Sequence, residues 1–165
     1  MRPKGQSGPA RRPYGPARTG HGPLAGRIGP FHSGPMISHI FAGANDFEGQ
    51  LAFYASVLET LGWSLKFVEA ERPWAGFRPP GAERPLFLVG RPHDGARASV
   101  GNGQMVALLA PNRAQVDKAY QAGLASGGAC DGPPGLRPHY HANYYGAYLR
   151  DPEGAKLCIC CHEPE

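Results

Sequence analysis

Acidic residues are missing from one part of the chain. Residues 1–35 contain no aspartate and no glutamate, although they hold six of the 17 lysines and arginines. The rest of the chain has 11 basic and 13 acidic side chains, so the formal charge of +4 arises from the amino-terminal segment. A nucleic-acid-binding fold gathers its basic residues on one surface. We therefore expect no nucleic-acid partner for the body of the chain.

Long apolar runs are also missing. No stretch approaches the roughly 20 apolar residues that a membrane-spanning helix requires. No apolar segment of about 7–15 residues follows the first basic residues either, which argues against a secretory signal. Four cysteines in a chain without an export signal indicate reduced thiols. We expect a cytoplasmic protein that has no membrane partner.

Glycine and proline are concentrated at the amino terminus. Residues 1–35 hold eight of the 24 glycines and seven of the 18 prolines. Such a segment cannot bury enough apolar surface to offset the entropy of ordering it. Two interpretations stay open: a disordered tail, or a segment upstream of a true start at Met36. The domain itself is expected at residues 36–165.

The first half of this domain reads as strand, helix and three strands. Asp46 is a good N-cap for a helix whose apolar residues recur at helical spacing, and Gly62 ends it as a glycine after a C-cap does. Strands are predicted in four segments: 37–43, 63–70, 73–79 and 85–91.

The second half repeats this order. A strand is predicted at 103–111 and a helix from Asn112 to residue 128. A terminal hairpin is predicted at 144–161, with Cys130 in a glycine-rich loop before it.

The two halves also match residue by residue. In the helices Tyr54 falls on Tyr120, and in the later strands "WAGF" (74–77) falls on "YGAY" (145–148) and "PLFLV" (85–89) on "KLCIC" (156–160). A repeat of this length indicates two fused copies of one module, about 36–98 and 102–165.

Two stretches carry a family resemblance: "ISHIFAGANDFEGQLAFYASVLETLGW" (37–63) and "YYGAYLRDPEGAKLCICCH" (144–162). Together they resemble the vicinal oxygen chelate superfamily, which includes glyoxalases, bleomycin-resistance proteins and extradiol dioxygenases, and in particular its small single-domain members. The resemblance implies an α+β fold in which two βαβββ modules form a curled mixed sheet around a cavity, usually in a homodimer.

The resemblance also implies where a metal would bind. Family enzymes hold a divalent ion with one residue, usually His or Glu, from each of four equivalent strand positions. These positions map here to His39, Met105, Phe87 and Cys158. Only His39 is an ordinary ligand, because a thioether binds hard ions poorly and phenylalanine binds none. We therefore predict either one divalent ion (Fe, Mn, Ni, Co or Zn) with His39 as a ligand, or no metal.

Sulfur and imidazole side chains offer other possibilities. In a strand, Cys158 and Cys160 share one face while Cys161 points the other way, which argues against a CxxC zinc site. The resemblance places Cys158 in the cavity near His39, as a nucleophile, a redox-responsive thiol or an inert wall residue. His139 and His141 would share a face of an extended segment. With His39 they could form a displaced metal site, or they could line the cavity mouth.

We predict Cys158 and His141 as catalytic candidates. The predicted ligand-binding residues are Trp74, Phe77, Arg78, Gln104, Tyr145 and Tyr148. The aromatic residues among them could instead lie in the core, and Arg78 could be ion-paired. Asp151 and Glu153 belong to the predicted hairpin turn, which needs no catalytic role for either of them.

Two functions follow from the resemblance. One is a glyoxalase-like enzyme of lyase, isomerase or dioxygenase type, acting on a small oxygenated metabolite in a cavity around His39. The other is a metal-free protein that sequesters a ligand, as bleomycin-resistance proteins do.

Overall fold

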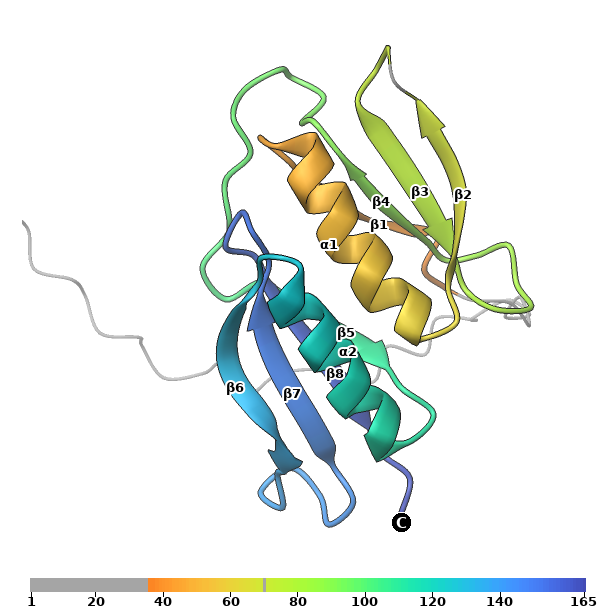
Figure 1. Ribbon diagram of the computed structural model, residues 1–165, viewed down its shortest axis with the longest axis vertical. Coiled ribbons are helices and arrows are strands. Elements are labelled where there is room, and N and C mark those ends of the chain that lie inside the picture. Colours follow the sequence, from red (N-terminus) through yellow and green to blue (C-terminus); the bar gives the residue numbers. More distant parts are fainter. Residues whose placement is uncertain (1–35, 70) are drawn as a thin grey trace, which may run out of the picture. The chain divides into compact units, whose positions relative to one another are not determined.

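The computed structural model describes residues 36–69 and 71–165, which belong to one compact unit of the chain (Figure 1). The two predictions for residues 1–35, a tail or a segment before the true start, lie outside the described residues. The first half contains β1 (His39–Gly43), α1 (Phe47–Thr60), β2 (Ser64–Glu69), β3 (Trp74–Arg78) and β4 (Leu86–Gly90). The second half contains β5 (Met105–Leu109), α2 (Arg113–Ala125), β6 (Ala129–Leu136), β7 (Tyr145–Arg150) and β8 (Lys156–Cys161).

The two halves have the same topology. Each forms a four-stranded sheet, in the order β1-β4-β3-β2 and β5-β8-β7-β6. In each sheet the first strand is parallel to the fourth, and the other neighbours are antiparallel. Figure 1 shows α1 and α2 side by side, each covering one face of its own sheet. The predicted α+β fold with two βαβββ modules is confirmed.

Local capping explains where the helices begin and end. The Asp46 carboxylate accepts a hydrogen bond from Gly49 N at 3.2 Å, and the Asn112 side chain accepts one from Gln115 N at 2.9 Å. Gly62 ends α1 with a φ of +78°. The second helix ends at Ala125, earlier than predicted, because Gly127 with a φ of +90° already turns the chain away. No helix in the described residues is long and apolar enough to cross a membrane.

The helices approach each other and β7 closely at one glycine. A Cβ added to Gly123 would lie 2.5 Å from Leu149 Cδ1 and 3.2 Å from Val57 Cγ2. Real Cβ atoms do not come so close to their neighbours, so glycine at this position lets α2 pack against both β7 and α1. Gly123 is the counterpart of Val57 in the repeat, and this difference between the copies allows the two helices to interlock.

The turn between β7 and β8 ties the second half to the first. Asp151 is only 3% exposed, and its Oδ2 accepts hydrogen bonds from Gln50 Nε2 at 2.5 Å and from Tyr54 OH at 2.8 Å. Glu153 accepts from the backbone N–H groups of Asn45 and Asp46. Beyond their place in the predicted hairpin turn, Asp151 and Glu153 therefore fasten this turn to α1.

Residues 129–136, predicted as a glycine-rich loop with Cys130, form the edge strand β6. Its sequence "ACDGPPGL" contains two prolines, which cannot donate to a sheet ladder. An edge strand tolerates them, and the pairing with β7 shifts register twice, on either side of Gly132. Cys130 therefore belongs to a strand, and this part of the prediction is wrong.

Strand pairing also corrects the predicted alignment of the later strands. His39 pairs with Leu86 and Met105 pairs with Lys156, so Leu86 and Lys156 are equivalent positions of β4 and β8. Leu88, not Phe87, is therefore the counterpart of Cys158. Since side chains alternate in a strand, a shift by a single position moves a side chain to the opposite face of the sheet.

Candidate functional site

The face of the β5–β8 sheet turned away from α2, called the open face below, presents Cys158 and Cys160. Cys161 belongs instead to the core cluster on the helix side. The predicted alternation of the three cysteines along β8 is therefore confirmed. All four cysteines are free, and the two on the open face are buried, at 0% and 3% exposure.

A chain of polar contacts crosses the open face. Tyr144 OH lies 3.5 Å from Cys158 Sγ, and Cys160 Sγ lies 3.8 Å from His162 Nε2. The other ring nitrogen of His162, Nδ1, lies 2.8 Å from His141 Nε2. The predicted site residues did not include His162. The alternation that places Cys158 and Cys160 on one face also places His162 beside them, and this signal could have found it.

The pKa values of the two thiols are shifted in opposite directions. A hydrogen bond from Cys158 lowers the pKa of Cys160 to about 6, against the opposing effect of burial and with help from Tyr144 and His162. The same contact, together with burial, raises the pKa of Cys158. Cys160 is thus the residue at which a thiolate forms near neutral pH, and a thiolate is the reactive form of cysteine. The predicted catalytic candidate Cys158 is instead the neighbour that contributes most to this lowered pKa.

The two histidines before β7 are not on an extended segment, as the sequence interpretation assumed. The stretch between β6 and β7 is a series of turns. His139 stacks against Tyr140, with ring centroids 4.3 Å apart, while His141 contacts His162. The predicted common face of His139 and His141 is therefore wrong, because turns do not alternate side chains as strands do.

A cavity of about 790 Å³, called the cationic cavity below, lies against the open face. Its wall is formed by residues 100–105, Asp131, Gly132, Arg137, His139, Tyr140, Tyr148, Arg150 and Lys156. Asp131 pairs with Lys156 at 2.9 Å and with Arg150 at 3.1 Å. The hydrogen bond from Lys156 lowers the pKa of Asp131, against a smaller opposing effect of burial, so this carboxylate is ionised at neutral pH.

A second cavity of about 260 Å³, called the apolar cavity below, adjoins the first. Its wall is formed by residues 40–43, Tyr54, Phe87, residues 98–101 and 104–106, Glu153, Ala155 and Lys156. The two cavities share Val100, Gly101, Gln104, Met105 and Lys156. The two cavities therefore lie next to each other.

Two of the predicted ligand-binding residues lie in this region. Gln104 lines both cavities, and Tyr148 lines the cationic cavity. Tyr145 is on the other face, where its hydroxyl donates to Asp117 of α2 at 2.8 Å. Phe77 is 2% exposed and belongs to the hydrophobic core. Trp74 packs on Phe67, with ring centroids 4.8 Å apart, and lines neither cavity.

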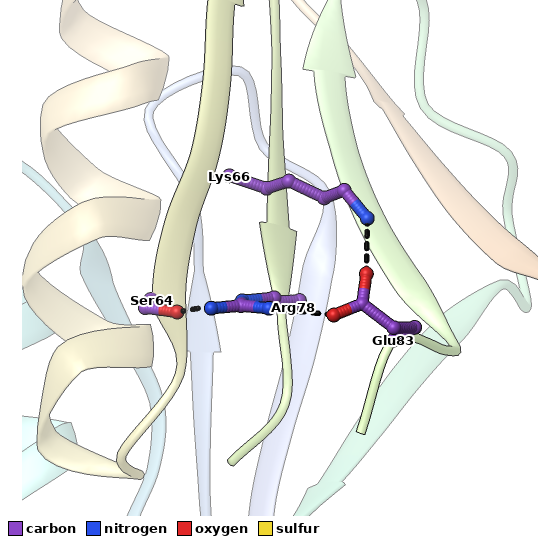
Figure 2. Close-up of polar contacts among 4 residues, drawn as sticks. All are labelled: Ser64, Lys66, Arg78 and Glu83. Carbon is purple, nitrogen blue, oxygen red and sulfur yellow. Dashed lines mark hydrogen bonds and ion pairs between the residues drawn. The ribbon is translucent and has the colours of Figure 1, made fainter. Parts of the chain in front are cut away.

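Arg78 lies at the end of β3, in the other sheet. Figure 2 shows its guanidinium between Ser64 and Glu83, with Lys66 on the second oxygen of the same carboxylate. These contacts lower the pKa of Glu83, chiefly through the hydrogen bonds from Lys66 and Arg78. Arg78 is therefore ion-paired with Glu83, which is the alternative that the sequence left open.

The predicted metal ligand His39 stands apart from both cavities. It is exposed at the start of β1, and its Nδ1 lies 3.3 Å from Ser38 Oγ. Neither His39 nor Cys158 lines the cationic or the apolar cavity. Within residues 36–69 and 71–165, no group of three or more His, Cys, Asp or Glu side chains is arranged to hold a metal ion.

Comparison with known proteins identifies the family. The model of the Glyoxalase/Bleomycin resistance protein/Dioxygenase superfamily matches residues 36–159, which is most of the chain. The chain belongs to this superfamily. The boundaries of the match agree with the duplicated fold, since it begins before β1 and reaches into β8.

Among solved structures, a glyoxalase/bleomycin resistance protein from Albidiferax ferrireducens T118 is 36% identical, with a TM-score of 0.67 over 79% of this chain and 100% of that one. A lactoylglutathione lyase from Agrobacterium tumefaciens is 19% identical, with a TM-score of 0.54 over 79% of this chain and 96% of that one. The second likeness shows the fold alone. No curated protein matches the chain at a significant level.

The superfamily's usual metal does not fit the residues at the corresponding positions. The strand pairing gives His39, Leu88, Met105 and Cys158 as the four positions. Leucine is no ligand, and the thioether of Met105 is a poor one for a hard ion. His39 and Cys158 are left, and within the described residues they belong to no group of three or more His, Cys, Asp or Glu side chains that could hold a metal ion.

Proposed function

We propose that this member of the superfamily binds a small organic molecule without a metal, in the joined cationic and apolar cavities. The observation that carries the proposal is the pair of adjoining cavities, of about 790 and 260 Å³, beside a ligand set that cannot hold a divalent ion. Ligand sites are typically clefts of about 300–1,000 Å³ with a few convergent polar groups. The proposal corresponds to the sequestering alternative from the sequence.

The apolar cavity supplies a surface for the body of such a ligand. Ile40, Phe41 and Val106 contribute aliphatic and aromatic wall, and Phe87 and Tyr54 form its inner end. Burying apolar ligand surface contributes roughly 25 cal/mol per Å². Gln104, on the wall of both cavities, offers an amide that can donate and accept hydrogen bonds.

A fluorescent neutral probe, N-phenyl-1-naphthylamine, tests this proposal. Saturable binding that is unchanged by chelator and by His39→Ala supports it. Val100→Trp, which fills the space shared by the cavities, should abolish binding. Val68→Trp is the matched control, because Val68 is an exposed valine that lines neither cavity. Binding that requires an added divalent ion, or that survives Val100→Trp, would contradict the proposal.

A catalytic alternative is favoured by the Cys160, His162 and His141 contacts. A thiolate next to a pair of hydrogen-bonded imidazoles is an arrangement that supports nucleophilic catalysis without a metal. Turnover of a carbonyl compound that is lost in both Cys160→Ser and His141→Ala, but kept in His39→Ala, would support this alternative to sequestration and establish His141 as catalytic.

We also propose that the protein is a homodimer. The first strands of the two sheets expose large apolar side chains: Phe41 at 46%, Met105 at 45% and Leu109 at 67%. Apolar patches of this kind commonly mark protein contacts. Free thiols at all four cysteines fit a reducing compartment, and we propose the cytoplasm.

A further inference from the structure

The cationic cavity carries more positive than negative charge. Arg137, Arg150 and Lys156 line it, against the single carboxylate of Asp131. His139 adds an imidazole to the same wall. Three cations and one carboxylate leave two positive charges without a counter-charge on the wall. A concave site with this excess raises the local concentration of anions.

Arg137 is held in place by the backbone. Its Nη2 donates to Pro133 O at 2.7 Å and its Nη1 to Leu136 O at 3.1 Å. A Cβ on Gly135 would lie 2.9 Å from Nη1, so glycine at this position leaves room for the guanidinium. Among the described residues, no ion pair joins Arg137 to a carboxylate. The guanidinium is thus fixed, while its charge is not neutralised by a partner.

Two of these cations lie over the ring of Tyr148. The Arg137 Cζ is 5.8 Å from the ring centroid, and the Lys156 Nζ is 5.0 Å from it. Both distances allow a cation–π contact. Because Tyr148 orients both side chains, the two charges gather around one aromatic ring. Lys156 lines both cavities and so stands where the cationic and apolar walls meet.

We propose that the joined cavities select an organic anion, with its carboxylate or phosphate group between Arg137 and Lys156 and its apolar part in the apolar cavity. This inference rests on the proposed binding function and names the class of its ligand. Arginine recognises planar oxyanions through its fork of N–H donors, and lysine contributes a point charge. Asp131 competes with the ligand for Lys156 and Arg150.

The other sheet provides an internal comparison. Lys66 and Arg78 there share Glu83, much as Lys156 and Arg150 share Asp131. That cluster, drawn in Figure 2, adjoins a smaller cavity of about 250 Å³ whose wall contains Arg78 as its single cation. Lys66→Ala is therefore a matched control for the loss of a lysine that is ion-paired but outside the proposed site.

The test compares three probes that share one ring system: 1-naphthoate, 1-naphthyl phosphate and the neutral 1-naphthalenemethanol. Their affinities for the full chain are measured by calorimetry at low and high salt. We expect at least one anion to bind about ten-fold more tightly than the alcohol at low salt, the scale of one hydrogen bond to a charged group. The anion with the larger gain in affinity over the alcohol identifies the preferred headgroup. This gain in affinity should shrink at high salt.

Variants separate recognition from structure. Arg137→Ala and Lys156→Ala should each weaken anion binding about ten-fold and weaken binding of the alcohol much less, whereas Lys66→Ala should change neither. Asp131→Asn should strengthen anion binding, a gain that a structural role would not produce. Equal affinity of all three probes, or anion binding that is kept in Arg137→Ala, would overturn the anion inference alone. Failure of every probe to bind would overturn the proposed function with it.

Discussion

Removal of one hydroxyl from α1 should weaken the connection between the two halves. Tyr54 is 3% exposed, and its hydroxyl donates at 2.8 Å to Asp151, itself 3% exposed. Tyr54→Phe leaves the ring in place and removes one hydrogen bond to a buried carboxylate. Such bonds contribute about 1.5–3 kcal/mol. We expect the free energy of unfolding to fall by that amount.

The repeat supplies a matched control. Tyr120 occupies the equivalent position in α2 and is 6% exposed. The neighbouring thiol of Cys130, an exposed residue, raises the pKa of its hydroxyl, and a thiol is a weak hydrogen-bonding group. Tyr120→Phe should therefore cost less than about 1 kcal/mol.

Urea unfolding followed by circular dichroism measures both variants. Equal losses in Tyr54→Phe and Tyr120→Phe, or no loss in the first, would refute the role given to the Asp151 contact. The m-value should stay the same, since neither change alters the surface exposed on unfolding.

The dependence of stability on alkaline pH gives an independent check of the contact between Tyr54 and Asp151. Burial, followed by the charge of Asp151 and its hydrogen bond, raises the pKa of Tyr54 above its ordinary 10.0. A phenol with a raised pKa in the folded state contributes stability that is complete below pH 10 and is lost as the pH rises further. The loss is about 1.4 kcal/mol per pH unit for one group. Tyr54→Phe should flatten the fall in stability above pH 10 by this amount.

Three further predictions concern other parts of the chain. The ultraviolet absorbance of the Cys160 thiolate should titrate with a midpoint at about pH 6. This titration should be lost in Cys160→Ser and should move to higher pH in Cys158→Ala. An ordinary thiol titration in the intact protein would contradict the effect of Cys158 on Cys160. Leu109 is 67% exposed, and Leu109→Asp should convert a dimer to a monomer in light scattering, while Val68→Asp should not. An unchanged molar mass in Leu109→Asp would exclude Leu109 from the interface. Against the opposing effect of burial, hydrogen bonds from Asp46 and Asn45 lower the pKa of Glu153, so its contribution to the free energy of unfolding is present above its ordinary pKa of 4.5 and is lost as the pH falls through the lowered value. Glu153→Gln should remove this acid dependence of stability, and a pH profile parallel to that of the intact protein would contradict the prediction.

Local signals in the sequence predicted the elements well. Asp46 and Asn112 cap their helices with side chains that reach only as far as the first turn, so the interaction is readable from the sequence. The alternation of Cys158, Cys160 and Cys161 follows from the period of a strand and needs no tertiary information.

The correspondence between the halves was mispredicted where the loops differ in length. The strand pairing makes Leu88 equivalent to Cys158. Gly76 pairs with Leu88 and Tyr148 pairs with Cys158, so Gly76 is equivalent to Tyr148. The gap in numbering between equivalent positions therefore differs from one strand to the next. A single alignment of the later strands paired Tyr148 with Phe77 instead of its neighbour Gly76, and this shift by one position put Phe77 on the wrong face.

The cationic cavity could not be predicted for a different reason. Arg137, Tyr148 and Lys156 become neighbours only through the pairing of β6, β7 and β8 and the turns that follow β6. The two prolines hid β6 from a reading based on strand propensity. Side chains brought together by such pairing leave no spacing in the sequence that would reveal them.

The fastening of α1 by residues 151–153 has a consequence for how the chain folds on the ribosome. Glu153 holds the start of α1 across a separation of 107 residues, and Asp151 holds Gln50 and Tyr54 across about the same interval. Synthesis delivers the first module before these two carboxylates exist. Until the hairpin of β7 and β8 leaves the exit tunnel, the polar groups of Gln50 and Tyr54 lack the partner that they have in the finished fold. The nascent first half therefore completes its structure only after residues 151–153 have been made.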